Sequence, residues 1–455
     1  MVERPGAGNN GFGHMSAQNG VLMRIQTRLA TALATAGLLS LLTACVGAPS
    51  KAPGPTISPS AAPASSGTAA CVADPGAVVA RQFSQAAKEV LPSAESDKLE
   101  AAAAQGFVDA ASEGAVVAVR SPGGTWQKSY GLADPATKTP MTTGVYQRVG
   151  SVTKTFTGTV VQQLVQDGQL ELDDPIANYV PEVPNGAAIT VRMLLNMTSG
   201  IASYTLDEKF MDELFSDPTK TWTPDQLLAT GLALPPLFAP GEQFNYSNTN
   251  FILLGRVVEK VTSKPFEQVL DELILAPLGL DATSMPGGSD PYPVPHAQGF
   301  TLQGTAEGDA TPVNTSGWNP TWAWTAGQMV STVDDLLVYG RALGTGQGLL
   351  NSEAQIDRLS SFPDGGGYGL AVGCIAGWVG HTGELPGYNT SVFYDTDTDI
   401  TVVVLANSDI PSGACDESKT LPDTVQTLPC MDPATRIFTA VSVALDHEFT
   451  PAPKQ

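Results

Sequence analysis

The sequence predicts an α/β protein of the α+β kind, with an antiparallel sheet flanked by helices and an inserted, mostly helical lobe. Hairpin signals lie near both ends of the folded part, and the run between them has helical periodicity. The 455 residues also exceed the roughly 250–300 that a single core organises, so two lobes are expected. Within one domain at 71–455, we place the sheet lobe at about 85–150 and 325–447 and the helical lobe at about 151–324.

Both hairpins are indicated by strand-forming runs on either side of turn residues. Ala115–Val119 and Trp126–Tyr130 flank Pro122-Gly123-Gly124. The β-branched runs Thr390–Tyr394 and Ile400–Ala406 flank a turn that alternates Asp and Thr. The two ends of the chain therefore supply the strands of the predicted sheet.

Two longer helices are predicted between the hairpins. Apolar residues recur at helical spacing from Phe156 to Val165, and Gly168 then stands where a helix stop is expected. A second run extends from Phe251 to Val261 with the same spacing. The apolar stretch Leu273–Leu280 follows, and Pro277 should limit any helix there because proline lacks the backbone N–H.

The charge balance is strongly acidic, with a formal net charge of −22. Removing residues 1–44 takes away three basic residues and one acidic residue, so the charge becomes −24. Such a surface repels the phosphate backbone, and nucleic acid is therefore excluded as an expected partner.

The N-terminal region has the pattern of a bacterial lipoprotein. Residues 1–22 are rich in Gly and Asn and are interpreted as a non-native upstream extension. A short basic segment and an apolar run form a signal peptide at 23–44, which ends in Leu42-Thr43-Ala44 before Cys45. Cys45 is the expected lipidation site, and the Pro/Ser/Ala-rich run 45–70 is the tether. We thus expect an exported protein anchored to the outer face of the cell membrane.

Four further cysteines predict disulfides, because an even number in an exported chain without Cys-x-x-Cys favours disulfides over metal binding. Cys415 and Cys430 bracket a short loop and are expected to pair. By elimination, Cys71 pairs with Cys374.

Ser151-Val152-Thr153-Lys154 is the first candidate for catalysis. Residues three apart on a helix share one face, so the Lys154 amine can reach the Ser151 hydroxyl. A serine is a poor nucleophile until a neighbour takes its proton, and burial lowers the pKa of a lysine enough for that role. Alone, the motif is more often a helix cap with a solvated lysine.

Two further motifs change that balance. Tyr246-Ser247-Asn248 precedes the second predicted helix, and Tyr-x-Asn occurs nowhere else in the chain. His381-Thr382-Gly383 precedes the final hairpin. Each has an ordinary structural explanation, as a capping turn or a glycine turn, but all three motifs in this order are hard to explain by chance.

Together the motifs resemble those of the penicillin-recognising serine hydrolases, and in particular the branch of secreted D-alanyl-D-alanine carboxypeptidases and class C β-lactamases. The resemblance extends to Thr198-Ser199-Gly200, Thr325-Ala326-Gly327 and Leu405-Ala406-Asn407, and covers about residues 85–447. It implies a β-lactamase/transpeptidase-like fold with the site between the sheet and the helical lobe. It implies no cofactor and no metal.

The resemblance also assigns roles. Ser151 attacks the carbonyl, while Lys154 and Tyr246 share the acid and base work in an order that stays open. The backbone N–H groups of Ser151 and Glu384 form the oxyanion hole, and Asn248 also orients Lys154. Substrate-binding positions are Asn248, His381, Thr382, Gly383 and Glu384.

The function implied is hydrolysis of small peptides, esters or β-lactams in the cell envelope through an acyl-enzyme. An esterase or D-amino-acid amidase with weak β-lactamase activity is one alternative, and a non-catalytic binding protein on the same fold is another. An α/β-hydrolase would need Gly-x-Ser-x-Gly, which is absent from the sequence. A zinc hydrolase is disfavoured because no histidines are paired at i, i+4.

The substrate is where the resemblance is weakest. The carboxypeptidases that the chain resembles hold a free carboxylate with a Thr after His-Thr-Gly and an Arg soon after Tyr-Gly-Leu. Here Glu384 replaces that Thr, and no cation follows Tyr368-Gly369-Leu370. Since Glu384 repels a carboxylate, we expect substrates without a free carboxylate to be preferred, with a protonated His381 as partial compensation.

Overall fold

The computed structural model of the chain describes residues 69–416 and 418–452. The predicted upstream extension (1–22), signal peptide (23–44), Cys45 and most of the tether (45–70) lie outside these residues. Within the described ranges, no helix combines the length and the apolar character that a membrane crossing requires.

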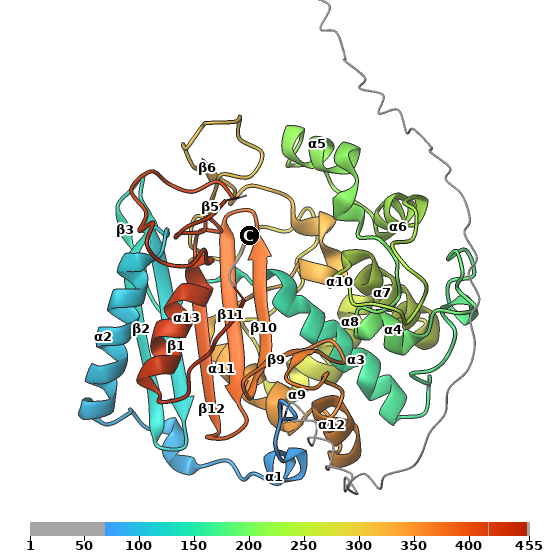
Figure 1. The fold of residues 1–455 in the computed structure, drawn as a ribbon, viewed down its shortest axis with the longest axis horizontal. Coiled ribbons are helices and arrows are strands. Elements are labelled where there is room, and N and C mark those ends of the chain that lie inside the picture. Colours follow the sequence, from blue (N-terminus) through green and yellow to red (C-terminus); the bar gives the residue numbers. More distant parts are fainter. Residues whose placement is uncertain (1–68, 417, 453–455) are drawn as a thin grey trace, which may run out of the picture. The chain divides into compact units, whose positions relative to one another are not determined.

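The centre of the fold is an antiparallel sheet of eight strands with the order β3-β2-β1-β12-β11-β10-β9-β8 (Figure 1). The strands are β1 (Gly114–Ser121), β2 (Gly124–Asp134), β3 (Thr139–Pro140), β8 (Gly367–Tyr368), β9 (Gly373–Ile375), β10 (Trp378–Leu385), β11 (Tyr388–Asp395) and β12 (Ile400–Ala406). Strands from both ends of the chain meet in the middle, where Ala115 pairs with Ala406. The predicted antiparallel sheet is confirmed.

Both predicted hairpins are present. In the first, Ser121 pairs with Gly124 across a two-residue turn, and Val119 pairs with Trp126. In the second, Asp395 pairs with Ile400. The register follows from the side-chain alternation, because a strand buried on both faces must send successive apolar residues to opposite sides.

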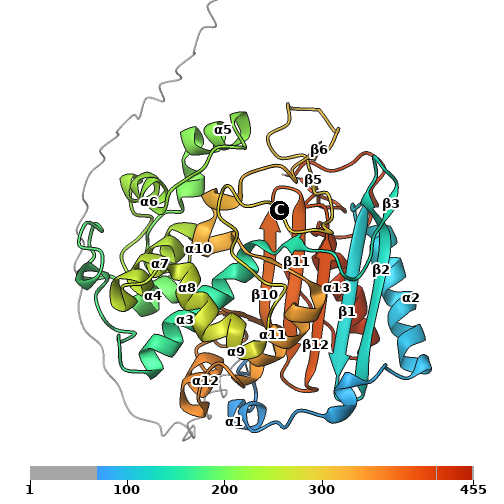
Figure 2. The same ribbon diagram turned by 180° about the vertical axis from the view of Figure 1, so that it is seen from behind.

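The sheet separates two apolar cores. On one face, α2 (Ser93–Asp109) and α13 (Pro433–Ala444) pack against residues such as Val117. On the other, α11 (Val333–Thr345) packs against residues such as Val116. Figure 2 shows α11 lying across this face of the sheet. The helices that flank the sheet are those that the fold class predicts.

The segment between the early and late strands is mostly helical. It contains α3 (Thr153–Gln166), α4 (Val191–Leu195), α5 (Glu208–Ser216), α6 (Pro224–Ala233), α7 (Asn248–Thr262), α8 (Phe266–Leu270), α9 (Ala276–Leu278) and α10 (Trp324–Gly327). Two short sheets pair β4 (Gln147–Arg148) with β7 (Val330–Ser331) and β5 (Phe300–Thr301) with β6 (Val313–Asn314). The remaining helices are α1 (Pro75–Val79) and α12 (Ser352–Leu359).

Both predicted longer helices are confirmed as α3 and α7. Helical structure runs from Phe266 to Leu278 and ends one residue after Pro277, which agrees with the expectation that this proline limits the helix. A π-helical turn over Asp271–Leu275 leads into α9 without a break, so Pro277 takes one backbone donor out of the continuing helix. Gly279, with φ +65°, then ends the helix.

Two disulfides fix the ends of the fold. Cys71 is bonded to Cys374 in β9, and Cys415 is bonded to Cys430. Both predicted pairs are therefore present in the structure.

Candidate active site between the sheet and the helical lobe

Ser151 lies in a 3₁₀ turn, Gly150–Val152, that leads directly into α3. Gly150 has a φ of +53°, a left-handed conformation that favours glycine. The turn packs closely on β10. A Cβ atom added to Gly150 would lie 2.6 Å from the Glu384 amide nitrogen, and one added to Gly383 would lie 3.3 Å from the Ser151 amide nitrogen. These two glycines thus allow the amides of Ser151 and Glu384 to lie close together.

Lys154 lies in the first turn of α3. Its Nζ atom is 3.1 Å from Ser151 Oγ and donates a hydrogen bond of 2.6 Å to the Ala326 carbonyl oxygen. The side chain is fully buried, and no carboxylate pairs with it among residues 69–416 and 418–452. Burial holds the pKa of Lys154 well below its ordinary value. A neutral amine in this position can accept the proton of the serine hydroxyl.

Tyr246 covers Lys154 from the segment just before α7. The Lys154 Nζ atom lies 4.9 Å from the centroid of the Tyr246 ring. The Tyr246 hydroxyl is buried and makes no hydrogen bond of standard geometry within the described part of the chain. Burial raises the pKa of Tyr246, the neighbouring Ser151 hydroxyl opposes the rise, and the Glu384 carboxylate adds to it. Tyr246 is therefore a protonated phenol near neutral pH.

Asn248 begins α7, and its backbone N–H donates to Ser203 Oγ at 3.2 Å. Asn248 was expected to orient Lys154, and among the described residues the hydrogen bonds of Lys154 Nζ go to Ser151 and Ala326. Ala326 supplies the carbonyl that orients Lys154 instead, because α10 packs against α3. Asn248 is half-buried at the start of the helix, within the same segment as Tyr246.

His381, Thr382 and Gly383 lie on β10, beyond the point where β9 pairs with it. His381 donates from Nδ1 to the Thr382 carbonyl oxygen, and Nε2 accepts from the Tyr368 hydroxyl at 3.1 Å. Burial lowers the pKa of His381 to about 4, and the nearby Lys154 contributes to this shift. His381 is thus neutral near pH 7, so the condition under which it would compensate for Glu384, a protonated ring, is not met.

The Glu384 side chain lies beside a second carboxyl group. Gln303 Nε2 donates to Glu384 Oε1 at 3.3 Å and also to Asp409. Asp409 is buried, and Thr301 Oγ1 donates to it at 2.8 Å. Burial raises the pKa of Asp409 to about 7, and the Glu384 carboxylate adds to the rise. The Glu384 side chain is therefore half-buried in an acidic environment rather than directed to open solvent.

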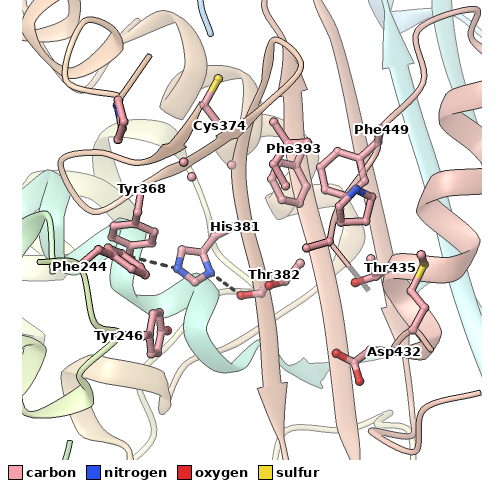
Figure 3. Close-up of a pocket in the computed structure, with 18 residues that line it drawn as sticks. Phe244, Tyr246, Tyr368, Cys374, His381, Thr382, Phe393, Asp432, Thr435 and Phe449 are labelled. Atoms are coloured by element: carbon pink, nitrogen blue, oxygen red, sulfur yellow. Dashed lines mark hydrogen bonds between the residues drawn. The ribbon is translucent and has the colours of Figure 1, made fainter. Parts of the chain in front are cut away.

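A cavity of about 530 Å³ adjoins these groups. Figure 3 shows Tyr246, Tyr368 and His381 clustered at one end, with Phe393 and Phe449 at the other. The lining residues are Phe244, Tyr246, Pro363, Gly367, Tyr368, Gly373, Cys374, Ile375, Gly380, His381, Thr382, Phe393, Met431, Asp432, Thr435, Phe449, Pro451 and Ala452. No described residue that lines it is Lys or Arg.

The possible metal ligands lie elsewhere. Asp395, Asp397 and His447 bring ligand atoms within 4.8 Å of one another. Asp395 pairs with Trp378 at the opposite end of β10 from Glu384, so this cluster does not belong to the Ser151 site.

The structure brings Ser151, Lys154, Tyr246, His381 and Glu384 into one neighbourhood. Ala326 and Tyr368 belong to sequence motifs named above, but the sequence indicates no role for either residue. The proximity of Asp409 to Glu384 had no sequence signal, since the two residues lie on different parts of the chain and meet only in the folded sheet.

Comparisons with known proteins identify the family of the chain. A sequence model of the Beta-lactamase family matches residues 97–421, and the chain belongs to that family. Protein flp of Staphylococcus aureus (strain MW2) is 31% identical over 218 residues, which are 46% of this chain and 41% of the relative. The matched stretch thus spans less than half the length of that curated relative.

Two solved structures are also similar. The D-stereospecific amidohydrolase from a Streptomyces species is 34% identical with a TM-score of 0.63, covering 68% of this chain and 94% of that one. The D-amino acid amidase from Ochrobactrum anthropi SV3 with D-phenylalanine is 26% identical with a TM-score of 0.62, covering 77% and 99%. The β-lactamase-like fold that the sequence predicted is confirmed.

Proposed function

We propose that this protein is a serine hydrolase that forms an acyl-enzyme on Ser151. The observation that carries the proposal is the fully buried Lys154, whose pKa is lowered and whose Nζ atom lies 3.1 Å from Ser151 Oγ. A solvated lysine at a helix start would be protonated and could not act as a base. Membership of the Beta-lactamase family supports the same assignment.

The proposed acylation uses Lys154 as the first base. Neutral Lys154 takes the Ser151 proton while Oγ bonds to the substrate carbonyl carbon, which gives a tetrahedral oxyanion and a lysine ammonium. Protonated Tyr246 then donates its proton to the leaving nitrogen or oxygen as the bond to carbon breaks. The resulting phenolate takes the proton from the Lys154 ammonium, and water releases the acyl group by the reverse steps.

The oxyanion would be held by the amides of Ser151 and Glu384. The close packing of the Gly150 turn on β10 supports this, because it places both nitrogens beside each other. In comparable sites the loss of one such donor costs about 2.7–4 kcal/mol of transition-state stabilisation. His381, Thr382, Gly383 and Asn248 would contact the substrate around this point.

The substrates that we propose are amides, esters or peptides with no free carboxylate next to the scissile bond. The adjoining cavity has no cation among its described lining residues, and His381 is neutral. Glu384 adds negative charge nearby. The two similar structures are named as an amidohydrolase and an amidase, which supports an amidase or esterase in preference to a carboxypeptidase.

The experiment for substrate class compares kcat/KM for an acyl-D-Ala-D-Ala peptide and for its C-terminal amide. We expect the amide to be hydrolysed at least tenfold more efficiently, with nitrocefin a poor substrate. Ser151→Ala serves as the blank. A preference for the free acid would contradict the charge argument.

The alternative of a non-catalytic binding protein is tested separately. A fluorescent fluorophosphonate should label the wild-type chain once, and Ser151→Ala should show no band. Equal labelling of both proteins would remove Ser151 from the role of nucleophile, and absence of labelling in both would favour the binding protein.

We also propose that the protein is exported and held at the membrane by lipid on Cys45. The support is the signal-like run that ends in Leu42-Thr43-Ala44 and the tether that follows. Cys45→Ala should release the protein into the medium and abolish incorporation of labelled fatty acid. Unchanged retention of Cys45→Ala in the membrane fraction would contradict this proposal.

A further inference from the structure

The apolar cavity beside the site has no role in the steps described so far. Its walls include Phe244, Tyr368, Ile375, Phe393 and Phe449, and its volume of about 530 Å³ lies in the range of small-molecule pockets. Tyr246, His381 and Thr382 form the part nearest the candidate site (Figure 3). The cavity is therefore continuous with the residues proposed to act on the substrate.

The space exists because glycines line the edge of the sheet there. Gly380 of β10 pairs with Gly373 of β9, which pairs in turn with Tyr368 of β8. Gly367, Gly373 and Gly380 all line the cavity and have no side chains to fill it. A Cβ atom on Gly373 would lie 3.3 Å from the Gly380 backbone oxygen and 4.0 Å from that of Gly367, so a side chain here requires a backbone shift of a few tenths of an ångström.

The position of Tyr246 indicates which part of a substrate the cavity faces. A leaving group must lie within hydrogen-bond reach of the group that protonates it. Tyr246, the proposed donor, lines the cavity, whereas Ser151 and Lys154 do not. The bond from the carbonyl carbon to the leaving atom would thus point from Ser151 towards the cavity.

We propose that this cavity is a leaving-group pocket and that it takes a large apolar amine or alcohol. The inference rests on the proposed function. In the acylation step the leaving nitrogen or oxygen takes the Tyr246 proton, its bond to the carbonyl carbon breaks, and the neutral amine or alcohol departs through the pocket. Apolar walls without Lys or Arg suit an alkyl or aryl group and do not suit a carboxylate.

The test is a series of amides with one acyl group and the amines methylamine, butylamine and hexylamine, together with the matching alkyl esters. These amines have similar basicity, so the series varies mainly the apolar bulk. Each methylene group that the pocket buries should raise kcat/KM by up to about fourfold. We expect the butyl substrate to exceed the methyl substrate by tenfold or more.

Two variants of the full chain locate the effect. Gly373→Val places a side chain in the pocket wall and should remove most of the gain with chain length, judged as the ratio of the butyl to the methyl rate within the same variant. Phe244→Ala removes a wall residue that is 55% exposed, so folding is not endangered, and it should reduce the gain by about threefold. Gly144→Val is the matched control, because a Cβ atom there meets nothing within 4 Å and Gly144 does not line the cavity.

Each outcome bears on the inference. Equal kcat/KM for all leaving groups in an enzyme labelled at Ser151 overturns the pocket and leaves the proposed function standing. A chain-length gain that persists in both Gly373→Val and Phe244→Ala also overturns it. An enzyme that is not labelled at Ser151 and hydrolyses none of the substrates contradicts the proposed function and, with it, this inference.

Discussion

The charge state of Lys154 can be measured through the stability of the fold. Lys154 is fully buried without a carboxylate partner among the described residues, and burial lowers its pKa in the folded state. In the unfolded chain its pKa returns to about 10.4. Between the two pKa values the unfolded chain therefore binds one more proton than the folded protein, and stability rises with pH.

The size of this pH dependence of stability follows from the one proton that Lys154 binds in the unfolded chain but not in the folded protein. A difference of one bound proton corresponds to about 1.4 kcal/mol for each pH unit. The proposed role of Lys154 as a base requires a neutral amine in the folded protein between pH 7 and pH 9, and burial shifts its pKa in that direction. The wild type should therefore gain about 2.7 kcal/mol between pH 7 and pH 9 relative to Lys154→Met, which has no group to titrate. This gain in the free energy of unfolding is lost as the pH falls towards the pKa of Lys154 in the folded protein.

The assay is urea unfolding of the full chain at pH 7, 8 and 9, followed by circular dichroism. Ser151→Ala is the matched control, because it is inactive but keeps Lys154 and should follow the wild-type slope. Parallel curves for the wild type and Lys154→Met would refute the reasoning. Lys154 would then be protonated in the folded state, and Tyr246 would have to be the first base.

Two further predictions concern the Tyr246 hydroxyl and the two disulfides. Tyr246→Phe should lower the acylation rate by about 10²–10⁴ through loss of the proton donor, measured by stopped-flow with a chromogenic ester, and a wild-type rate would contradict that role. The Cys71–Cys374 bond has a sequence separation of 303 and the Cys415–Cys430 bond one of 15. Chain entropy predicts that the free energy of unfolding falls by roughly 6 kcal/mol when the first bond is removed and by roughly 3 kcal/mol when the second is removed. The measurement is the unfolding midpoint of the two double-serine variants. Equal midpoints in these two variants would count against the entropic account.

Much of the fold could be predicted because its signals are local. The apolar run Ala115–Val119 beside its turn residues and the helical spacing from Phe156 to Val165 are properties of neighbouring residues, and both elements formed where they were expected. Pro277 is a further local signal, because a proline cannot donate to the next helical turn, and the helix ends one residue later at Leu278.

The candidate site likewise has features that the sequence predicts and features that only the fold sets. The spacing of Ser151 and Lys154 on one helix face needs only the period of the helix. The protonation states needed the whole fold, because burial and neighbouring charges come from distant segments. His381 illustrates this: its sequence context allowed a compensating cation, and burial together with the Tyr368 contact leaves it neutral.

The sequence by itself determined the antiparallel sheet from both chain ends, the two longer helices, the order of the three motifs and the even number of cysteines that favours disulfides. Only the tertiary structure decided that Ala326 orients Lys154, that Asp409 lies beside Glu384, and that an apolar cavity opens next to Tyr246. The physical reason is the distance along the chain over which each effect acts. Turn and periodicity signals act over a few residues, whereas desolvation and cavity shape depend on residues that only the folded chain brings together.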